Sequence, residues 1–137
     1  MNRNINLIID DSGSIEGYQN IKIQDLNNVI NGFVNNIICE CLDKIEFAQR
    51  LDVFKAILSK LAFDGTATFK CINATMLSSR ILKNEIDAKK ISDIIKDINS
   101  LWTESLIVEA FSSFPNIVVQ KNYIEHIYTV ITVTKTL

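Results

Sequence analysis

Residues 37–72, IICECLDKIEFAQRLDVFKAILSKLAFDGTATFKCI, decide the fold of this chain. Within this stretch, residues 46–62 place their apolar side chains on one stripe of a helix and their charged side chains away from it, which predicts an amphipathic helix. The segment Ile37–Cys41 before the helix and the segment Thr66–Ile72 after it are rich in apolar and β-branched residues, which favours strands. A strand, a helix and a strand in this order predict two parallel strands joined by a helical crossover.

Toward the N-terminus, the pattern predicts short strands and few helices. Ile5–Ile9 is a mostly apolar run that predicts a buried strand, and the turn-forming cluster Asp10–Ser14 closes it. Ile21–Gln24 is a candidate second strand, and it follows too soon after the first for a full helical crossover between them. Residues 26–35 contain helically spaced apolar side chains interrupted by turn formers, and we expect a loop there.

Toward the C-terminus, helices come first and two strands follow. We expect a short helix over Met76–Leu82, a longer one that begins near Asp87, and a third over Thr103–Phe114. The β-rich segments Ile117–Tyr123 and Ile127–Lys135 are close enough in sequence to pair as an antiparallel hairpin. The order of elements therefore predicts an α/β fold with a small, Rossmann-like, mostly parallel sheet and a C-terminal antiparallel hairpin.

Composition agrees with a single globular domain over residues 1–137. The chain is 47% hydrophobic and 22% charged, which is typical of a globular protein. Its net charge of −2 and the lack of a basic run give nothing to attract nucleic acid. The apolar run near the N-terminus is too short for a signal peptide or a membrane span.

The cysteines and the residue usage bear on the compartment. Three cysteines without framework spacing are typical of a reducing compartment. The chain is rich in Asn and Ile and has one proline, as in proteins encoded by AT-rich genes of phages or low-GC bacteria. We therefore expect a cytoplasmic protein, or a virion component if a phage encodes it, with neither a nucleic-acid nor a membrane partner.

Several short stretches resemble class I S-adenosylmethionine-dependent methyltransferases. The stretch from Cys39 to Phe69 resembles the fourth strand, the following helix and the fifth strand of that family, with Leu42, Ile45, Leu61 and Gly65 at matching positions. The other similar stretches are Gly17–Ile21, Ile107–Val119 and Val133–Lys135. The resemblance covers most of the chain in short pieces. It implies a fold in which S-adenosylmethionine binds at the carboxyl ends of the parallel strands.

The residues that would hold this cofactor depart from the family's pattern. The resemblance implies glycines after the first strand, where the backbone must approach the cofactor, and this chain has Ile8 and Ile9 followed by two aspartates. Lys22 stands where the family has an acidic residue at the end of the second strand. If a cofactor site is retained, the resemblance and the charges assign it to six residues: Asp10, Asp11, Ser12, Gly13, Tyr18 and Asp25.

The same turn also fits a different motif. Asp10, Ser12 and Ser14 match the Asp-x-Ser-x-Ser pattern of the metal-ion-dependent adhesion motif in von Willebrand A domains, which likewise follows a buried first strand. A carboxylate and two hydroxyls are hard oxygen ligands that suit Mg²⁺. That motif also needs a Thr from a later loop, for which Thr66 is the candidate. Alternatively, these residues simply end a strand and cap a turn, which is their commoner role.

The remaining candidate residues favour structural roles. Cys39, Cys41 and Cys71 lack a fourth ligand for zinc, and we expect them to be thiols of the core. His126 lies alone at the expected hairpin turn, without a nucleophile or partner in the sequence. We therefore assign no catalytic residue and no metal ligand.

The sequence predicts a fold that has lost its usual chemistry. We expect a non-catalytic methyltransferase-like domain without a cofactor, acting as a protein-binding, structural or assembly component with a protein partner or a second copy of itself. The terminal hairpin, residues 117–135, is the expected pairing surface, because sheet edges invite pairing. Two alternatives stay open: an active S-adenosylmethionine-dependent methyltransferase with an altered pocket, and a metal-dependent adhesion-type binding module.

Overall fold

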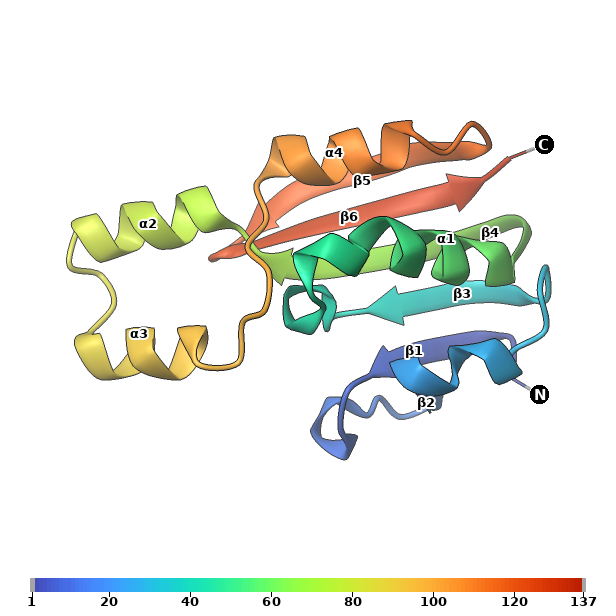
Figure 1. Cartoon of the computed structure of the whole chain (residues 1–137), viewed down its shortest axis with the longest axis horizontal. Helices are drawn as coiled ribbons and strands as arrows, with labels where there is room; N and C mark the ends of the chain where they lie inside the picture. The colour runs from blue at the N-terminus through green and yellow to red at the C-terminus, as the bar shows by residue number, and fades with distance from the viewer. Residues whose placement is uncertain (1, 137) are drawn as a thin grey trace.

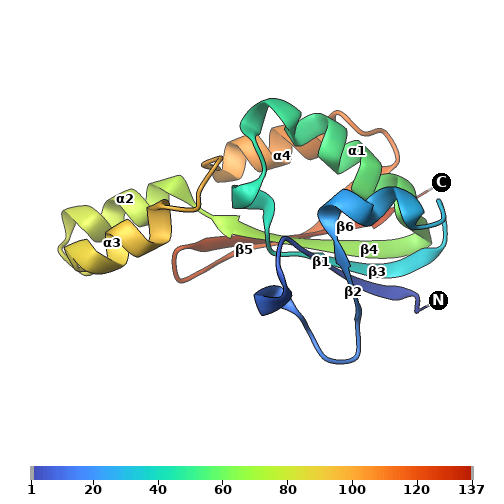
Figure 2. The same cartoon turned by 60° about the horizontal axis from the view of Figure 1, so that its bottom comes forward.

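The computed structural model describes residues 2–136 and contains a six-stranded sheet with helices packed mainly on one face (Figures 1 and 2). The strands are β1 Asn4–Ile8, β2 Gln19–Lys22, β3 Val34–Cys39, β4 Leu61–Ile72, β5 Ile117–Glu125 and β6 Tyr128–Lys135. The α-helices are α1 Arg50–Lys60, α2 Ala74–Leu82, α3 Ala88–Ile95 and α4 Glu104–Ser112. No helix in this part of the chain is both long enough and apolar enough to cross a bilayer.

The sheet has the strand order β2-β1-β3-β4-β6-β5. Strands β2, β1, β3 and β4 run parallel to one another, and β6 runs antiparallel to both β4 and β5. This confirms the predicted α/β fold with a mostly parallel sheet and a C-terminal antiparallel hairpin. The winding direction reverses between β1 and β3, and α/β proteins bind their ligands at such a reversal, beside the carboxyl ends of the strands.

Only one face of the sheet has a helical layer. Figure 2 shows α1, α4 and the 3-10 helix Ile23–Asn28 above the sheet, whereas the loop between β1 and β2 curls below it. Helices α2 and α3 extend past the carboxyl ends of β3 and β4 (Figure 1). The two faces of the sheet therefore have very different surroundings.

The covered face holds an aromatic core. Phe54 of α1 packs edge-on against Phe69 of β4, with ring centroids 5.4 Å apart, and lies 4.8 Å from the ring of Phe111 of α4. Trp102 is 1% exposed and its ring lies 5.6 Å from that of Phe54. Aromatic pairs at these separations add to the stability given by area burial alone, and they fix α1 and α4 over the centre of the sheet.

The uncovered face carries amides and hydroxyls instead. Asn4, Asn36 and Thr66 are neighbours on three adjacent strands. The Asn36 amide donates to Asn4 at 2.9 Å, and the Thr66 hydroxyl donates to Asn36 at 2.7 Å. The hydroxyls of Thr68 and Thr132 lie 3.1 Å apart across β4 and β6. Side chains that bond to one another and to water suit a sheet face that stays in solvent, which explains how the fold does without a second helical layer.

The helix predicted over residues 46–62 is shorter than expected. Residues Phe47–Gln49 form a 3-10 turn, α1 covers Arg50–Lys60, and Leu61 already begins β4. Leu61 pairs with Val34, and the next pair is Asn36 with Thr66, so residues 62–65 bulge out of the ladder. The helical spacing of Leu61 is misleading, because its burial comes from strand pairing.

Other boundaries also move by a few residues. The second strand is Gln19–Lys22, not Ile21–Gln24, because Ile23 already begins a 3-10 helix. The expected loop over 26–35 is thus partly helical, and β3 begins at Val34, earlier than predicted. The helix near Asp87 is confirmed with Asp87 as its N-cap, but it ends at Ile95.

Candidate functional site

The first strand ends at a position filled by its own side chains. Ile8, the last residue of β1, is only 4% exposed. Its Cγ2 atom lies 3.2 Å from the place where a Cβ on Gly13 would be, so the Ile8 side chain packs directly on this glycine. Gly13 therefore gives room to Ile8, whereas the family's glycines leave room for a cofactor.

Five backbone amides of the loop after β1 donate within the protein. In dinucleotide-binding folds, amides at this place and the start of a long helix point at the ligand. Here the helix is one 3-10 turn, Asp11–Gly13. The amides donate as follows: Ser12 to Asp10 Oδ1 at 3.0 Å, Gly13 to the Asp10 carbonyl at 3.3 Å, Ser14 to the Asp11 carbonyl at 3.2 Å, Ile15 to Asn20 Oδ1 at 2.9 Å and Tyr18 to the Ile15 carbonyl at 3.4 Å. These five donors are already engaged within the protein.

Two asparagines that the sequence analysis missed fix this loop beneath the sheet. Asn6 of β1 is 1% exposed, and its amide donates to the Gly13 carbonyl at 2.8 Å and to Asn20 Oδ1 at 2.9 Å. Asn20 in turn donates to the Ile15 carbonyl at 3.1 Å. A polar residue inside an apolar strand, as in Ile5-Asn6-Leu7, is the signal that could have identified this anchor.

Asp10 serves as the cap of the turn. Both the amide and the hydroxyl of Ser12 donate to its carboxylate. These hydrogen bonds, with smaller contributions from Lys44 and Lys22, hold the pKa of Asp10 below its usual value of 3.8. The side chain is fully exposed, so the ionised form is both solvated and hydrogen-bonded.

The structure brings only part of the predicted cofactor set together. Asp11, Lys22 and Asp25 line one open depression of about 450 Å³ beside β1 and β2. Tyr18 instead lines a separate groove on the uncovered face of the sheet. Ser12 and Gly13 belong to the closed turn described above. Cofactor binding by all six residues together stays a prediction that this geometry does not favour, because the residues point to different surfaces.

Of the predicted cation ligands, Asp10 and Ser12 lie in contact, but Thr66, the candidate from a later loop, is far from them. Asn36, the hydrogen-bond partner of Thr66, pairs with Asn4 at the start of β1, whereas Asp10 follows the end of that strand. Six residues of extended strand place Thr66 about 20 Å from Asp10, too far to share one ion. Within residues 2–136, no cluster of three or more His, Cys, Asp or Glu side chains is arranged to hold a metal.

The three cysteines are core thiols, as expected, and all are buried and free. The Sγ atoms of Cys39 and Cys41 lie 3.9 Å apart at the carboxyl end of β3. Burial, together with the nearby carboxyl of Asp43, raises the pKa of Cys71 to about 12. Burial likewise raises the pKa of Asp43 itself. Cys71 is thus protonated and inert near neutral pH.

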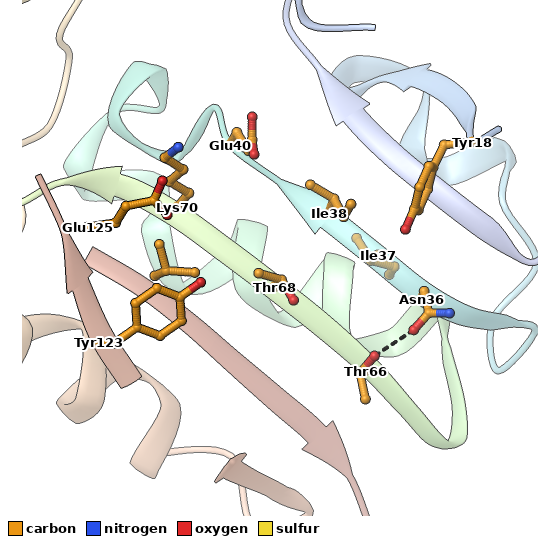
Figure 3. Close-up of a pocket in the computed structure, with 11 residues that line it drawn as sticks. Tyr18, Asn36, Ile37, Ile38, Glu40, Thr66, Thr68, Lys70, Tyr123 and Glu125 are labelled. Carbon is orange, nitrogen blue, oxygen red and sulfur yellow. Dashed lines mark hydrogen bonds between the residues drawn. The ribbon is translucent and has the colours of Figure 1, made fainter. Parts of the chain in front are cut away.

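The uncovered face contains a shallow groove that sequence reasoning did not identify. Figure 3 shows Tyr18 and Tyr123 on opposite sides of it, with Thr68 between them and Glu40 and Lys70 toward one end. Its volume is about 240 Å³, smaller than the usual range for drug-sized ligands. The alternate residues Thr66, Thr68 and Lys70 of β4 contribute to it, so the alternation of polar residues in that strand is the signal that could have indicated it.

Comparison with solved structures identifies the class of fold. A methyltransferase of Archaeoglobus fulgidus that depends on S-adenosylmethionine superposes with a TM-score of 0.65 at 9% identity, covering 96% of this chain and 75% of that protein. A possible histamine N-methyltransferase of Thermotoga maritima gives 0.66 at 11% identity, covering 99% and 83%. A Burkholderia thailandensis N1-methyltransferase, solved with 1,6-didemethyltoxoflavin and S-adenosylhomocysteine, gives 0.63 at 12%, covering 98% and 62%.

The chain has the class I methyltransferase fold, and its small sheet with the closing hairpin is a methyltransferase-like one. At identities this low the likeness concerns the fold alone. Two further matched methyltransferases are much longer, and the chain covers only 36% and 35% of them. No protein-family model and no curated protein sequence matches the chain.

Proposed function

We propose that this chain is a methyltransferase-like domain that transfers no methyl group and acts as a structural or assembly component through protein contacts. The observation that carries the proposal is the closed turn after β1. Ile8 occupies the space beside Gly13, and the amides of residues 12–15 bond within the protein. Ile8 fills space that a nucleoside cofactor would need, and the amides of residues 12–15 are already engaged, so the residues present do not fit S-adenosylmethionine in the usual manner.

Calorimetric titration with S-adenosylmethionine and S-adenosylhomocysteine tests this proposal. We expect no heat of binding for either compound up to millimolar concentration. Thermal unfolding gives an independent readout, because a ligand present at 100 times its Kd stabilises the folded state by about 2.7 kcal/mol. Micromolar binding in either assay would refute the proposal.

An active methyltransferase with a shifted pocket is the second candidate. The depression between β1, β2 and the 3-10 helix Ile23–Asn28 supports it, because its volume of about 450 Å³ lies within the range of small-molecule sites. Asp11 and Asp25 lie within it and could bond to an ammonium or to ribose hydroxyls. In this case Asp25→Asn should weaken cofactor binding, whereas Asp93→Asn, an exposed change on α3, should leave it unchanged.

A further inference from the structure

Strand β5 is an exposed edge of the sheet. It pairs with β6 on one side, and no other strand of residues 2–136 pairs with its outer side. Its residues from Val118 to Glu125 are all exposed. Among them, Val118, Val119, Tyr123 and Ile124 are large and apolar, with exposures of 50%, 36%, 50% and 46%. A long apolar edge with free backbone donors and acceptors is a template for pairing with another strand.

The regular part of this edge is the segment 121–125, sequence KNYIE. The ladder between β5 and β6 shifts register between Val119 and Lys121, and it is regular from there to Glu125. Lys121, Tyr123 and Glu125 lie opposite successive alternate residues of β6, Thr132, Val130 and Tyr128. These three side chains therefore share the uncovered face of the sheet, and Asn122 and Ile124 lie on the helical face.

We propose that β5 pairs antiparallel with β5 of a second copy of this chain, about a two-fold axis at Tyr123. In that register Tyr123 faces Tyr123 of the partner subunit, and Lys121 faces Glu125 of the partner subunit. The two-fold axis repeats the second contact, giving two opposite-charge pairs that flank one aromatic pair. Directly opposed aromatic and opposite-charge pairs are the favourable cross-strand pairs of antiparallel sheets.

The charges select this register over its neighbours. An axis at Lys121 would place two lysines directly opposite each other, which is unfavourable. An axis at Asn122 would place Glu125 against Val119 of the partner subunit and leave Lys121 without a carboxylate. No described residue forms an ion pair of 4 Å or less with Lys121 or Glu125 within the chain, and Lys70 of β4 is the cation that lines the same groove as Glu125.

The same charges favour a second copy over an unrelated strand. A lysine on an edge strand usually blocks pairing. Here Lys121 needs an acidic residue opposite it on the partner strand. A second copy of β5 supplies one, because Glu125 lies four residues after Lys121 in the same strand. On the helical face, Ile124 lies in one depression with Val108 of α4, which is 38% exposed, so apolar surface continues beside the edge.

Charge reversal tests the proposed pairing. Sedimentation analysis should find the wild type as a dimer, and Lys121→Glu or Glu125→Lys alone should raise the dimer Kd at least about tenfold, because each turns two attractive pairs into two repulsive ones. The double variant Lys121→Glu/Glu125→Lys should restore the wild-type Kd. Lys89→Glu, on an exposed face of α3, is the matched control for net charge and should change nothing. A monomeric wild type, or a double variant no better than the single ones, would overturn the proposal.

Cysteine cross-linking tests the register. Opposed residues of antiparallel strands have Cα atoms about 4.5–5.5 Å apart, within reach of a disulfide. Tyr123→Cys should therefore form a covalent dimer under mild oxidation. Lys121→Cys should not do so alone, but it should link to Glu125→Cys when the two variants are mixed. The wild type, whose cysteines are buried, is the control. Linking by Lys121→Cys alone, or none by Tyr123→Cys, would refute this register.

This inference rests on the proposed function, in which the chain acts through protein contacts, but the two can fail separately. A monomer that binds no S-adenosylmethionine would remove the dimer and leave the non-catalytic role. A dimer that binds S-adenosylmethionine at micromolar concentration would do the reverse.

Discussion

Gly65 is the position where a single added methyl group should cost the most. A Cβ on Gly65 would lie 2.8 Å from the carbonyl oxygen of Ala62 and 2.9 Å from that of Val34. Ordinary carbon–oxygen contacts are about 3.3–3.6 Å, so both carbonyls would have to retreat by roughly half an ångström. Both oxygens belong to the backbone where β4 joins β3, and neither can move away by a change of rotamer.

We expect Gly65→Ala to lower the free energy of unfolding by about 1–3 kcal/mol, the usual cost of overpacking. With a urea m-value of about 2 kcal/mol/M, the unfolding midpoint should fall by roughly 0.5–1.5 M at constant m. Circular dichroism during urea titration measures this shift. Gly17→Ala is the comparison, because Gly17 has a φ of 85° but nothing within 4 Å of an added Cβ. That variant carries only conformational strain, about 1 kcal/mol. An unchanged midpoint for Gly65→Ala would refute the reasoning about the bulge.

Three further outcomes are expected. The pKa of the Asp10 carboxyl, measured by carbon-13 NMR, should lie below 3.8, and it should rise again in Ser12→Ala. Because the pKa is lowered in the folded state, the contribution of Asp10 to stability is present above about pH 4 and is lost as the pH falls through the folded pKa. Cys71, with a pKa of about 12, should resist alkylation by iodoacetamide at pH 8 until urea unfolds the protein. If Cys71 in the folded protein reacted as fast as an exposed thiol, its burial would be contradicted. Asn73→Ala should cost about 1–3 kcal/mol in urea unfolding, because it removes the cap of α2 and leaves the buried Thr129 hydroxyl without its 2.8 Å partner; a cost below 0.5 kcal/mol would argue against that network.

The parts of the fold with strong periodicity were predictable from sequence. The β-rich runs around Ile5, Thr66 and Ile131 and the apolar stripe of α1 reflect burial on one face, and burial is what periodicity records. Element ends were less predictable. Leu61 continues the helical stripe of α1, yet it belongs to β4, because pairing with Val34 outweighs helix propensity.

The position and residue types of the turn at the end of β1 were predictable from the sequence, but its packing contacts were not. The bulk of Ile8 and the turn-forming Asp10–Ser14 cluster are visible in the sequence, and both lie where expected. Packing of Ile8 on Gly13 depends on the path of the whole loop, which Asn6 fixes from the neighbouring strand. The placement of Asp11 and Asp25 around one depression likewise needs the 3-10 helix Ile23–Asn28, which the sequence pattern did not reveal.

A sheet covered by helices on one face only makes a thin, two-layered molecule. Nearly all of its apolar burial must come from that side, so substitutions among Phe54, Phe69 and Phe111 should be tolerated poorly, whereas the Asn and Thr ladder opposite should accept many polar replacements. The exposed polar positions of that ladder, such as Asn36, Thr66 and Thr68, could therefore be changed to display new binding residues on a rigid platform, provided that buried Asn6, which anchors the loop after β1, is kept.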